Sequence, residues 1–431
     1  MTNHPLISTL KSLRGNVRGC VLTEPLWGIP FNLYAPYVSV YMLSLGLADS
    51  QIGLLTSISL LLQVFWTAVS GAITDKFGRK RTTLVSDLIS WSIPCLIWAA
   101  AQDFNYFLAA VIFNSIWRVS ANSWTCLLVE DTDPKLLIDV YSLIYIAGLV
   151  AAFVSPVTGV LIDQFSLVPT MRGLYLLSFV MMTAKFLIMN NMVTETQRGV
   201  ARMEETRHQP WLGMLREYPQ VLRQILRMPA TVFAAVLMIL LNIVWTVKGT
   251  FWSILVTETL LIPAEHLVIF TFARSIVMLV FYFTVMPRLN SIDVRAPLIW
   301  GMLGLTVSQV FLIAAPPGNY AILLAVTALE AFATPAATTL VDKLVITAID
   351  PKERARILAI LYVVMIVLTS PFGWIAGQLS EWNRILPFLL MIALLCAGVA
   401  LLFLSNRLVK GGLEYPADQT VVEPAGLPAP E

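Results

Sequence analysis

Four ionisable residues, Arg118, Lys248, Arg274 and Glu330, lie near the middle of long apolar stretches of the sequence. A charged side chain in such surroundings costs free energy unless it faces a partner or a water-filled cavity, so these residues are candidates for function. Three of them are cations and one is a carboxylate, which indicates a site that is positive overall. We therefore expect a ligand with an anionic or strongly polar group.

Polar and aromatic side chains recur around these charges at helical spacing. Residues four positions apart lie on one side of a helix. Asn114, Arg118 and Asn122 therefore share a face, as do Glu330 and Thr334. Tyr34, Tyr37 and Tyr41 share a face on the first apolar stretch, and Trp245 shares a face with Lys248.

A purely structural role remains open for the same residues. Arg118 or Lys248 can pair with Glu330 to hold two parts of the chain together, and the tyrosines can simply pack. Lys185 lies toward one end of its apolar stretch, and we expect its amino group to extend to the membrane surface.

If the expected ligand is moved against its own gradient, the sequence indicates that an ion gradient supplies the energy for this movement. It contains no nucleotide-binding loop, so we expect no cofactor and a drive by an ion gradient, with protons as the expected ion. A gradient supplies about 2.3 kcal/mol per charge per 100 mV. A buried carboxylate can take up and release a proton, and the two candidates are Glu330 and Glu24.

Other chemistry finds little support. His4, His208 and His266 lie outside the apolar stretches, and the four cysteines are scattered singly, so no metal site or catalytic pair is expected. The net charge of +2 is too small to indicate a nucleic-acid partner. We expect no enzymatic activity. A receptor or scaffold in the membrane remains the alternative from another class.

The elements that must position these residues are membrane-spanning helices. Of the chain, 58% is hydrophobic and 13% charged, and the apolar residues form blocks of roughly 20 residues, which suffice to cross about 30 Å of hydrocarbon. Backbone groups in such blocks must bond internally, which predicts helices. The sequence predicts an all-α membrane protein with twelve spans, at 20–46, 51–73, 82–101, 104–129, 136–163, 170–192, 229–258, 264–287, 295–315, 319–342, 355–379 and 384–406.

Basic residues set the expected orientation. With the N-terminus inside, nearly all lysines and arginines of the loops fall on the inner side, and the outer side receives Arg172 and Arg384. We expect a multi-pass protein of the cell membrane with both termini in the cytoplasm.

The two halves of the chain resemble each other. The stretch from Arg118 to Asp131 ends in Leu-Leu-Val-Glu-Asp, and the stretch from Glu330 to Lys343 ends in Thr-Leu-Val-Asp-Lys. This predicts two pseudo-symmetric six-helix bundles, at 1–192 and 229–407. We expect the stretch 193–228 to be a cytoplasmic linker with an amphipathic helix, and 408–431 to be a disordered tail.

The loop between the second and third predicted spans carries a motif. It runs from Gly71 to Arg81 and reads Gly-Ala-Ile-Thr-Asp-Lys-Phe-Gly-Arg-Lys-Arg. We expect Gly71 to let two helices approach closely and Gly78 to form a tight turn. Asp75 is expected to lie near the start of the third span, where the helix dipole favours a carboxylate.

This loop resembles the signature loop of the major facilitator superfamily, and the resemblance in architecture covers nearly the whole chain. It implies a secondary active transporter that works by alternating access, and we expect it to act as a monomer in the lipid bilayer. It further implies a cytoplasmic gating contact between the Arg of the motif and an acid at the end of span four. The residues at these positions are Gly71, Asp75, Gly78, Arg79, Lys80, Glu130 and Asp131.

The same resemblance implies that spans one, four, seven and ten line a central cavity, which places the polar faces described above around one substrate. Partial matches to the antiporter patterns of the family, Arg118 followed by Ala121-Asn122 and Ser155-Pro156 followed by Gly159, favour proton-coupled export. A proton-coupled importer of a sugar or an organic acid is the alternative.

Overall fold

The computed structural model describes residues 5–133, 136–207, 223, 225–285, 295–349 and 354–409. Most of the amphipathic helix expected within 193–228 lies outside these residues, and so does the tail from 410 onward. The described elements are helical, as the apolar blocks predict.

Proline residues break the first span of the N-terminal half into short pieces. Pro25 begins one helix, Pro30 lies inside it, and Pro36 lies in a turn of 3-10 helix, because proline lacks the N–H that continues a helix. The helices of this half are α1 (Pro5–Ser12), α2 (Gly15–Thr23), α3 (Pro25–Tyr34), η1 (Ala35–Tyr37), α4 (Val38–Ser44), α5 (Asp49–Phe77), α6 (Arg79–Asp87), η2 (Leu88–Ser92), α7 (Ile93–Ala99), α8 (Phe104–Asn114), α9 (Trp117–Val129), α10 (Leu137–Ala152), α11 (Pro156–Phe165) and α12 (Leu167–Met192).

A short helix, α13 (Gln197–Thr206), follows the N-terminal half, and the C-terminal half is built of longer uninterrupted helices. Pro335 and Pro371 lie inside two of them. The helices of this half are α15 (Pro229–Ile254), η5 (Leu255–Thr259), η6 (Ala264–His266), α16 (Leu267–Thr284), α18 (Arg295–Ile313), α19 (Tyr320–Thr347), α20 (Arg354–Trp382) and α21 (Leu386–Val409).

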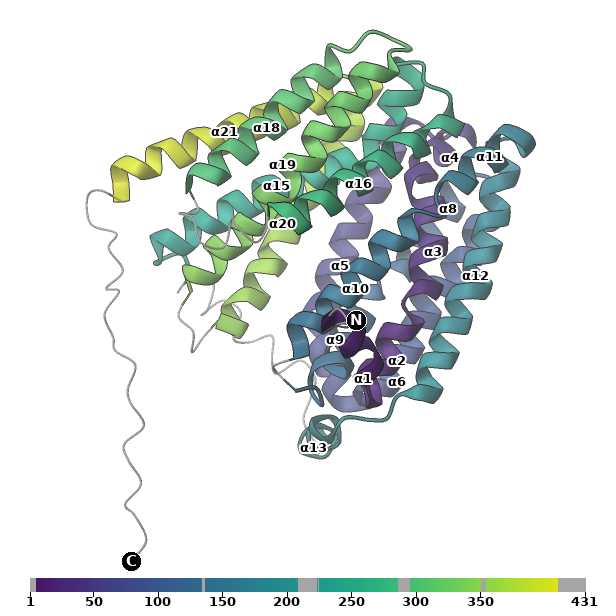
Figure 1. The fold of residues 1–431 in the computed structure, drawn as a ribbon, viewed down its shortest axis with the longest axis vertical. Coiled ribbons are helices and arrows are strands. Elements are labelled where there is room, and N and C mark those ends of the chain that lie inside the picture. The colour runs from purple at the N-terminus through teal and green to yellow at the C-terminus, as the bar shows by residue number, and fades with distance from the viewer. Residues whose placement is uncertain are drawn as a thin grey trace, which may run out of the picture.

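Ten helical segments in the described residues are long and apolar enough to cross a membrane. The other two predicted spans, 20–46 and 104–129, are present as consecutive shorter helices, α2 to α4 and α8 to α9. The chain therefore has the predicted twelve transmembrane segments, in two bundles of six. Figure 1 shows the N-terminal bundle in purple through blue to teal and the C-terminal bundle in teal through green to yellow, with α13 at one end.

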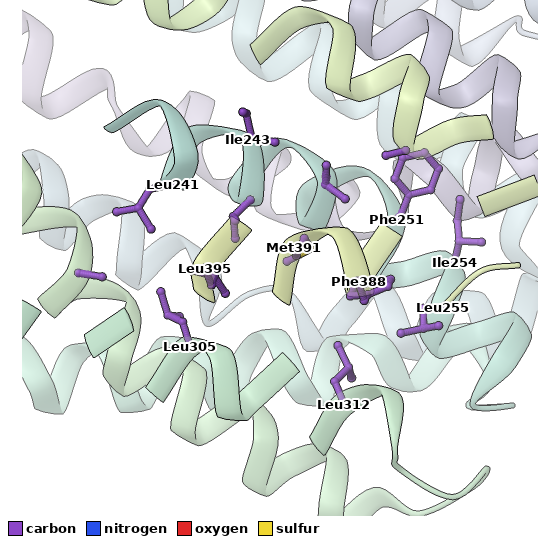
Figure 2. Close-up of a cluster of buried hydrophobic side chains, with 14 of the residues drawn as sticks. Leu241, Ile243, Phe251, Ile254, Leu255, Leu305, Leu312, Phe388, Met391 and Leu395 are labelled. Carbon is purple, nitrogen blue, oxygen red and sulfur yellow. The ribbon is translucent and has the colours of Figure 1, made fainter. Parts of the chain in front are cut away.

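Apolar side chains fill the interior of each bundle. Figure 2 shows the part of the core where α15, α18 and α21 meet, with Leu241, Leu305 and Met391 directed into it. Each of these side chains is almost fully buried. Such packing fixes the relative positions of the helices that carry the polar residues.

The two halves meet where α5 crosses α20, and we name the two ends of the molecule after residues at the ends of α5, the Asp49 end and the Asp75 end. Gly53 faces Gly373 and Gly377 so closely that a Cβ atom at Gly53 would lie 2.4 Å from the Gly373 carbonyl oxygen. Close approach had been expected at Gly71, but a Cβ there would meet nothing within 4 Å. The small residues that permit close helix contact in this conformation are therefore Gly53, Gly373 and Gly377.

Candidate functional site

A cavity of about 180 Å³ lies between α15, α16 and α19, and η1 of the N-terminal half closes one side of it. Its charged residues are Lys248, Arg274 and Glu330, each from a different helix. Trp245, also expected in the site, lines the same cavity. Four of the residues predicted for a substrate site therefore come together from three helices.

Glu330 lies between the two cations. Its Oε2 atom forms an ion pair with Lys248 Nζ, and its Oε1 atom lies 3.8 Å from Arg274 Nη1. The side chains of Lys248 and Glu330 are almost completely buried, whereas that of Arg274 is 34% exposed. Two cations and one carboxylate leave one positive charge uncompensated within the cavity.

Hydrogen-bonding capacity is also left over in this cavity. Glu330 Oε1 and the indole Nε1 of Trp245 are buried and have no hydrogen-bond partner among the described residues. The Arg274 guanidinium lies 5.8 Å from the centroid of the Trp245 ring. Buried polar atoms usually find partners, so these atoms are available to a bound solute.

Arg118 and its two asparagine neighbours contact other helices of the N-terminal half. Arg118 Nε donates to Gln63 Oε1 at 2.9 Å, and its guanidinium lies 4.2 Å from the Trp117 ring centroid. Asn122 donates to Thr74 Oγ1, and Asn114 donates to the Ser90 carbonyl. Within the described residues Arg118 has no ion-pair partner, so the pairing of Arg118 with Glu330 that was considered above is not present.

Tyr34 and Thr334 lie outside the lining of the central cavity. Tyr34 is 3% exposed and packs against Tyr175 at a centroid distance of 5.0 Å, inside the N-terminal bundle. Tyr41, from the same predicted face, donates to the Trp98 carbonyl, so these tyrosines belong to the packing of the bundle. Thr334 is 6% exposed on α19, one turn from Glu330.

Lys185 does not reach the membrane surface as expected. It is 6% exposed and forms an ion pair with Glu24, with Nζ 2.8 Å from Oε2. Both residues line a second cavity, inside the N-terminal bundle, together with Asp87, an acid that the sequence analysis overlooked. Each of the two proposed proton carriers, Glu24 and Glu330, is thus paired with a lysine.

The signature loop forms the expected contact at the Asp75 end. Arg79 forms a bidentate pair with Glu130, with Nη2 3.0 Å from Oε1 and Nε 3.1 Å from Oε2. Arg79 also pairs with Asp75, at 3.0 Å. The second candidate acid, Asp131, instead accepts a hydrogen bond from Asn16 at 3.5 Å. Gly78 has a φ of 84°, a conformation that favours glycine, which explains its place in the turn.

Glu195 and Arg202, which follow α12 in the chain, complete this contact. Neither was singled out from the sequence. The Glu195 carboxylate accepts hydrogen bonds from the backbone N–H groups of Arg79 and Lys80, at 2.9 and 3.0 Å. Glu195, and not Asp75 as expected, is therefore the acid at the start of α6. Arg202 of α13 pairs with Asp75 at 2.9 Å, and this hydrogen bond raises the pKa of the Arg202 guanidinium. Both residues lie in a polar stretch where sequence spacing gave no signal.

Polar contacts join the two halves at the Asp49 end. Asp49 of α5 accepts hydrogen bonds from Ser380 Oγ at 2.6 Å and from Arg384 Nε at 3.2 Å. Arg384 also reaches Glu258, at 3.3 Å. Further along the same crossing, Ser57 Oγ donates to the Ser370 carbonyl. These contacts close the Asp49 end.

Comparison with known proteins gives the same architecture. The chain is 28% identical over 126 residues to YqjV of Bacillus subtilis, an uncharacterized MFS-type transporter, and this stretch covers 29% of the chain and 30% of that protein. It is 27% identical over 126 residues to major facilitator superfamily domain-containing protein 10 of Mus musculus, covering 29% of the chain and 27% of that protein. The matched stretch therefore spans less than a third of either relative.

Solved structures match over nearly the whole chain. The nucleoside transporter NupG has a TM-score of 0.67 at 15% identity and covers 92% of this chain and 99% of its own. The human organic anion transporter MFSD10 has a TM-score of 0.61 at 14% identity, covering 90% and 98%. The xylose transporter XylE from E. coli, in an inward open conformation, has a TM-score of 0.64 at 16% identity, covering 90% and 96%. At these identities the matches show the fold.

The family is given by the sequence itself. The model of the Major Facilitator Superfamily matches residues 27–267, which is more than half of the chain and includes the loop from Gly71 to Arg81. With its twelve transmembrane segments and its Arg79–Glu130 contact, the chain belongs to the major facilitator superfamily of membrane transporters.

Proposed function

We propose that this transporter carries a small organic anion together with a proton, by alternating access. The observation that carries the proposal is the position of Glu330 between Lys248 and Arg274 in the central cavity. These two cations are the natural partners of a substrate carboxylate or phosphate, and in this conformation an internal carboxylate occupies them.

The ion pair supports symport over antiport. A substrate anion that binds Lys248 and Arg274 must displace Glu330, which would leave a buried carboxylate without a partner. If Glu330 takes up a proton, it no longer competes for the cations, and it can donate a hydrogen bond to the substrate. Proton and anion then bind in the same step. Under an inward proton gradient this mechanism drives uptake, so we favour import of an organic acid over the proton-coupled export expected from the family patterns.

The walls of the cavity suggest the body of the substrate. Trp245, Trp252 and Phe270 contribute aromatic faces beside the charged groups, and the cavity of about 180 Å³ suits a small molecule with one flat or apolar part. Arg118 is a half-buried cation with no ion-pair partner in the described residues. We propose that it adds to the positive potential that attracts the anion.

We propose that the Asp49 end faces outward and the Asp75 end faces the cytoplasm, as the distribution of basic residues favours. The contact between Asp49 and Arg384 then closes the outer end, and the conformation described here is inward-facing. Outward opening requires the α5–α20 crossing to separate at that end. Among the fold relatives, MFSD10 is described as an organic anion transporter, which agrees with an anionic substrate.

The experiment is uptake by proteoliposomes under an imposed proton gradient, with benzoate and its neutral analogue benzamide as the first pair of a panel of small acids. We expect uptake of an acid but not of its amide, faster when the substrate side is acidic. Glu330→Gln should retain binding and lose the pH dependence, because glutamine mimics the protonated acid. Lys248→Ala should lose binding by about tenfold or more, because it removes a charge-assisted contact.

A control variant separates the site from the overall charge. Arg18 is exposed and distant in sequence from the cavity residues, so Arg18→Gln removes one positive charge and should leave uptake unchanged. Equal uptake of acids and amides would contradict the proposal, as would unchanged pH dependence in Glu330→Gln. Binding of an acid without any transport would instead favour the receptor alternative.

A further inference from the structure

The second cavity, inside the N-terminal bundle, has a charge opposite to that of the central cavity. It measures about 190 Å³, and its charged residues are Glu24, Asp87 and Lys185. Asp87 is 7% exposed and Lys185 is 6% exposed, so both groups are largely removed from solvent. Glu24 and Lys185 neutralise each other through their contact at 2.8 Å. Asp87 therefore leaves one negative charge in excess when all three groups are ionised.

The remaining wall of this cavity is dominated by indole rings. Four of the twelve tryptophans of the chain line it, from three different helices: Trp27, Trp91, Trp117 and Trp124. The faces of aromatic rings attract cations, and tryptophan does so most strongly. The Lys185 ammonium already lies 5.7 Å from the Trp27 ring centroid and 5.9 Å from that of Trp124. The arrangement of the rings therefore accommodates a cation, as the position of the Lys185 ammonium beside two of them illustrates.

We propose that this cavity is a second ligand site, which binds a small organic cation such as an alkylammonium or a quaternary ammonium ion. Its charge would balance Asp87 and Glu24, and its alkyl groups would contact the indole rings. The volume is sufficient, because an enclosed cavity of roughly 150 Å³ holds a molecule the size of benzene. An inorganic cation would make few apolar contacts with the four indole rings, whereas an organic cation interacts both with the carboxylates and with the rings.

Lys185 competes with the ligand for Glu24, because the two residues already form an ion pair. An incoming cation therefore interacts mainly with the Asp87 carboxylate and shares Glu24 with Lys185. The site is independent of the proposed anion site, because the three charged groups here belong to α2, α6 and α12 or their boundaries, and those of the central cavity belong to α15, α16 and α19. The two halves of the molecule thus carry cavities of opposite charge.

The test uses choline as a probe and 3,3-dimethylbutan-1-ol as its neutral analogue of the same shape. Binding to the purified full-length protein is measured by titration calorimetry and by tryptophan fluorescence, at constant ionic strength set with NaCl. We expect choline to bind saturably and about tenfold more tightly than the alcohol, from the cation–π and charge contributions. Equal binding of the alcohol, or displacement of choline by sodium at similar concentration, would overturn the proposal.

Variants locate the site. Asp87→Asn should weaken choline binding by about tenfold or more, because it removes the excess charge. The matched control is Asp163→Asn, since Asp163 is an exposed carboxylate of α11, and it should leave binding unchanged. Unchanged choline binding in folded Asp87→Asn would contradict the assignment of the site.

A second variant keeps the proposal testable if Asp87→Asn does not fold. Lys185→Ala leaves Glu24 without its cation, and it should bind choline more tightly than the wild-type chain does. Choline should also raise its Tm more than it raises that of the wild type, because the ligand replaces the missing ammonium. A folded Lys185→Ala protein that choline does not stabilise would overturn the proposal, whatever the outcome for benzoate at the central cavity.

Discussion

Arg384 of the C-terminal half donates a hydrogen bond to the Asp49 carboxylate of the N-terminal half, with Nε 3.2 Å from Oδ2. The same carboxylate oxygen accepts from Ser380 at 2.6 Å, so two groups next to each other in the C-terminal half depend on one acid at the start of α5. Asp49 is 4% exposed, which makes these hydrogen bonds stronger than a surface ion pair. Asp49 is therefore the point at which a single substitution should loosen the Asp49 end.

We predict that Asp49→Asn shifts the molecule toward opening at this end. Hydrogen bonds to charged groups contribute about 1.5–3 kcal/mol, so the open population should rise about tenfold or more. The measurement is the rate at which a membrane-impermeant maleimide, added from outside, labels Ser253→Cys in the central cavity, with the native cysteines replaced. Asp163→Asn serves as the control for loss of a negative charge. Equal labelling rates in the two variants would contradict the role of Asp49.

A second prediction concerns the close crossing of α5 and α20. Gly53→Ala places a methyl group 2.4 Å from the Gly373 carbonyl oxygen, which is closer than van der Waals contact, so the helices must move apart. We expect a loss of about 1–3 kcal/mol from the closed arrangement, and faster labelling of Ser253→Cys. Gly71→Ala is the control, because the same helix has open space at that position. Faster labelling in Gly71→Ala, with no change in Gly53→Ala, would contradict this interpretation.

The sequence predicted the helices better than the contacts between them. Apolar blocks and the glycine of a tight turn are local features, so the spans and the turn at Gly78 followed from them, whereas the break of the first span near Pro36 was not predicted. Lys248 and Glu330 were identified because a charge inside an apolar block is visible in one dimension. Lys248 and Glu330 form an ion pair, and in the described residues Arg118 forms none. Both facts depend on the orientation of each helix about its own axis, which the sequence does not reveal.

Other residues were missed for physical reasons. Asp87 lies close to the basic residues that end the signature loop, where a charge is unremarkable, and its burial comes from packing against α9 and α12. Lys185 has an apolar stem long enough to reach the surface, and Glu24 holds it inside. Glu195 contacts the start of α6 and Arg202 contacts Asp75, and both come from a polar stretch where charged residues are common and none stands out.

A third prediction concerns the bidentate contact of the signature loop. Arg79→Lys keeps the positive charge but loses the second parallel hydrogen bond to Glu130, because an ammonium is not a planar fork. We expect transport to fall several-fold with little change in substrate affinity, since the contact lies at the Asp75 end and not in the cavity.

The matched control for this prediction is Arg202→Lys. The Arg202 side chain is 34% exposed and the pair it makes with Asp75 is accessible to water, so its contribution is smaller. Transport rates and substrate binding are measured for both variants in proteoliposomes. A larger loss for Arg202→Lys than for Arg79→Lys would show that α13, rather than Glu130, controls the loop.

The fourth prediction concerns the buried pair in the central cavity. Lys248→Met leaves Glu330 buried with only Arg274 near it, at 3.8 Å, and Glu330→Gln leaves Lys248 without its carboxylate. Removal of one partner of a buried pair costs about 3–5 kcal/mol, whereas removal of both with neutral side chains of similar size costs much less. We therefore expect the double variant Lys248→Met, Glu330→Gln to unfold at a higher temperature than Lys248→Met alone.

The double variant should nevertheless not bind benzoate, because only Arg274 remains of the two cations that the anion requires. If the double variant is less stable than both single variants and still takes up the acid, Lys248 and Glu330 neither compensate each other nor form the anion site.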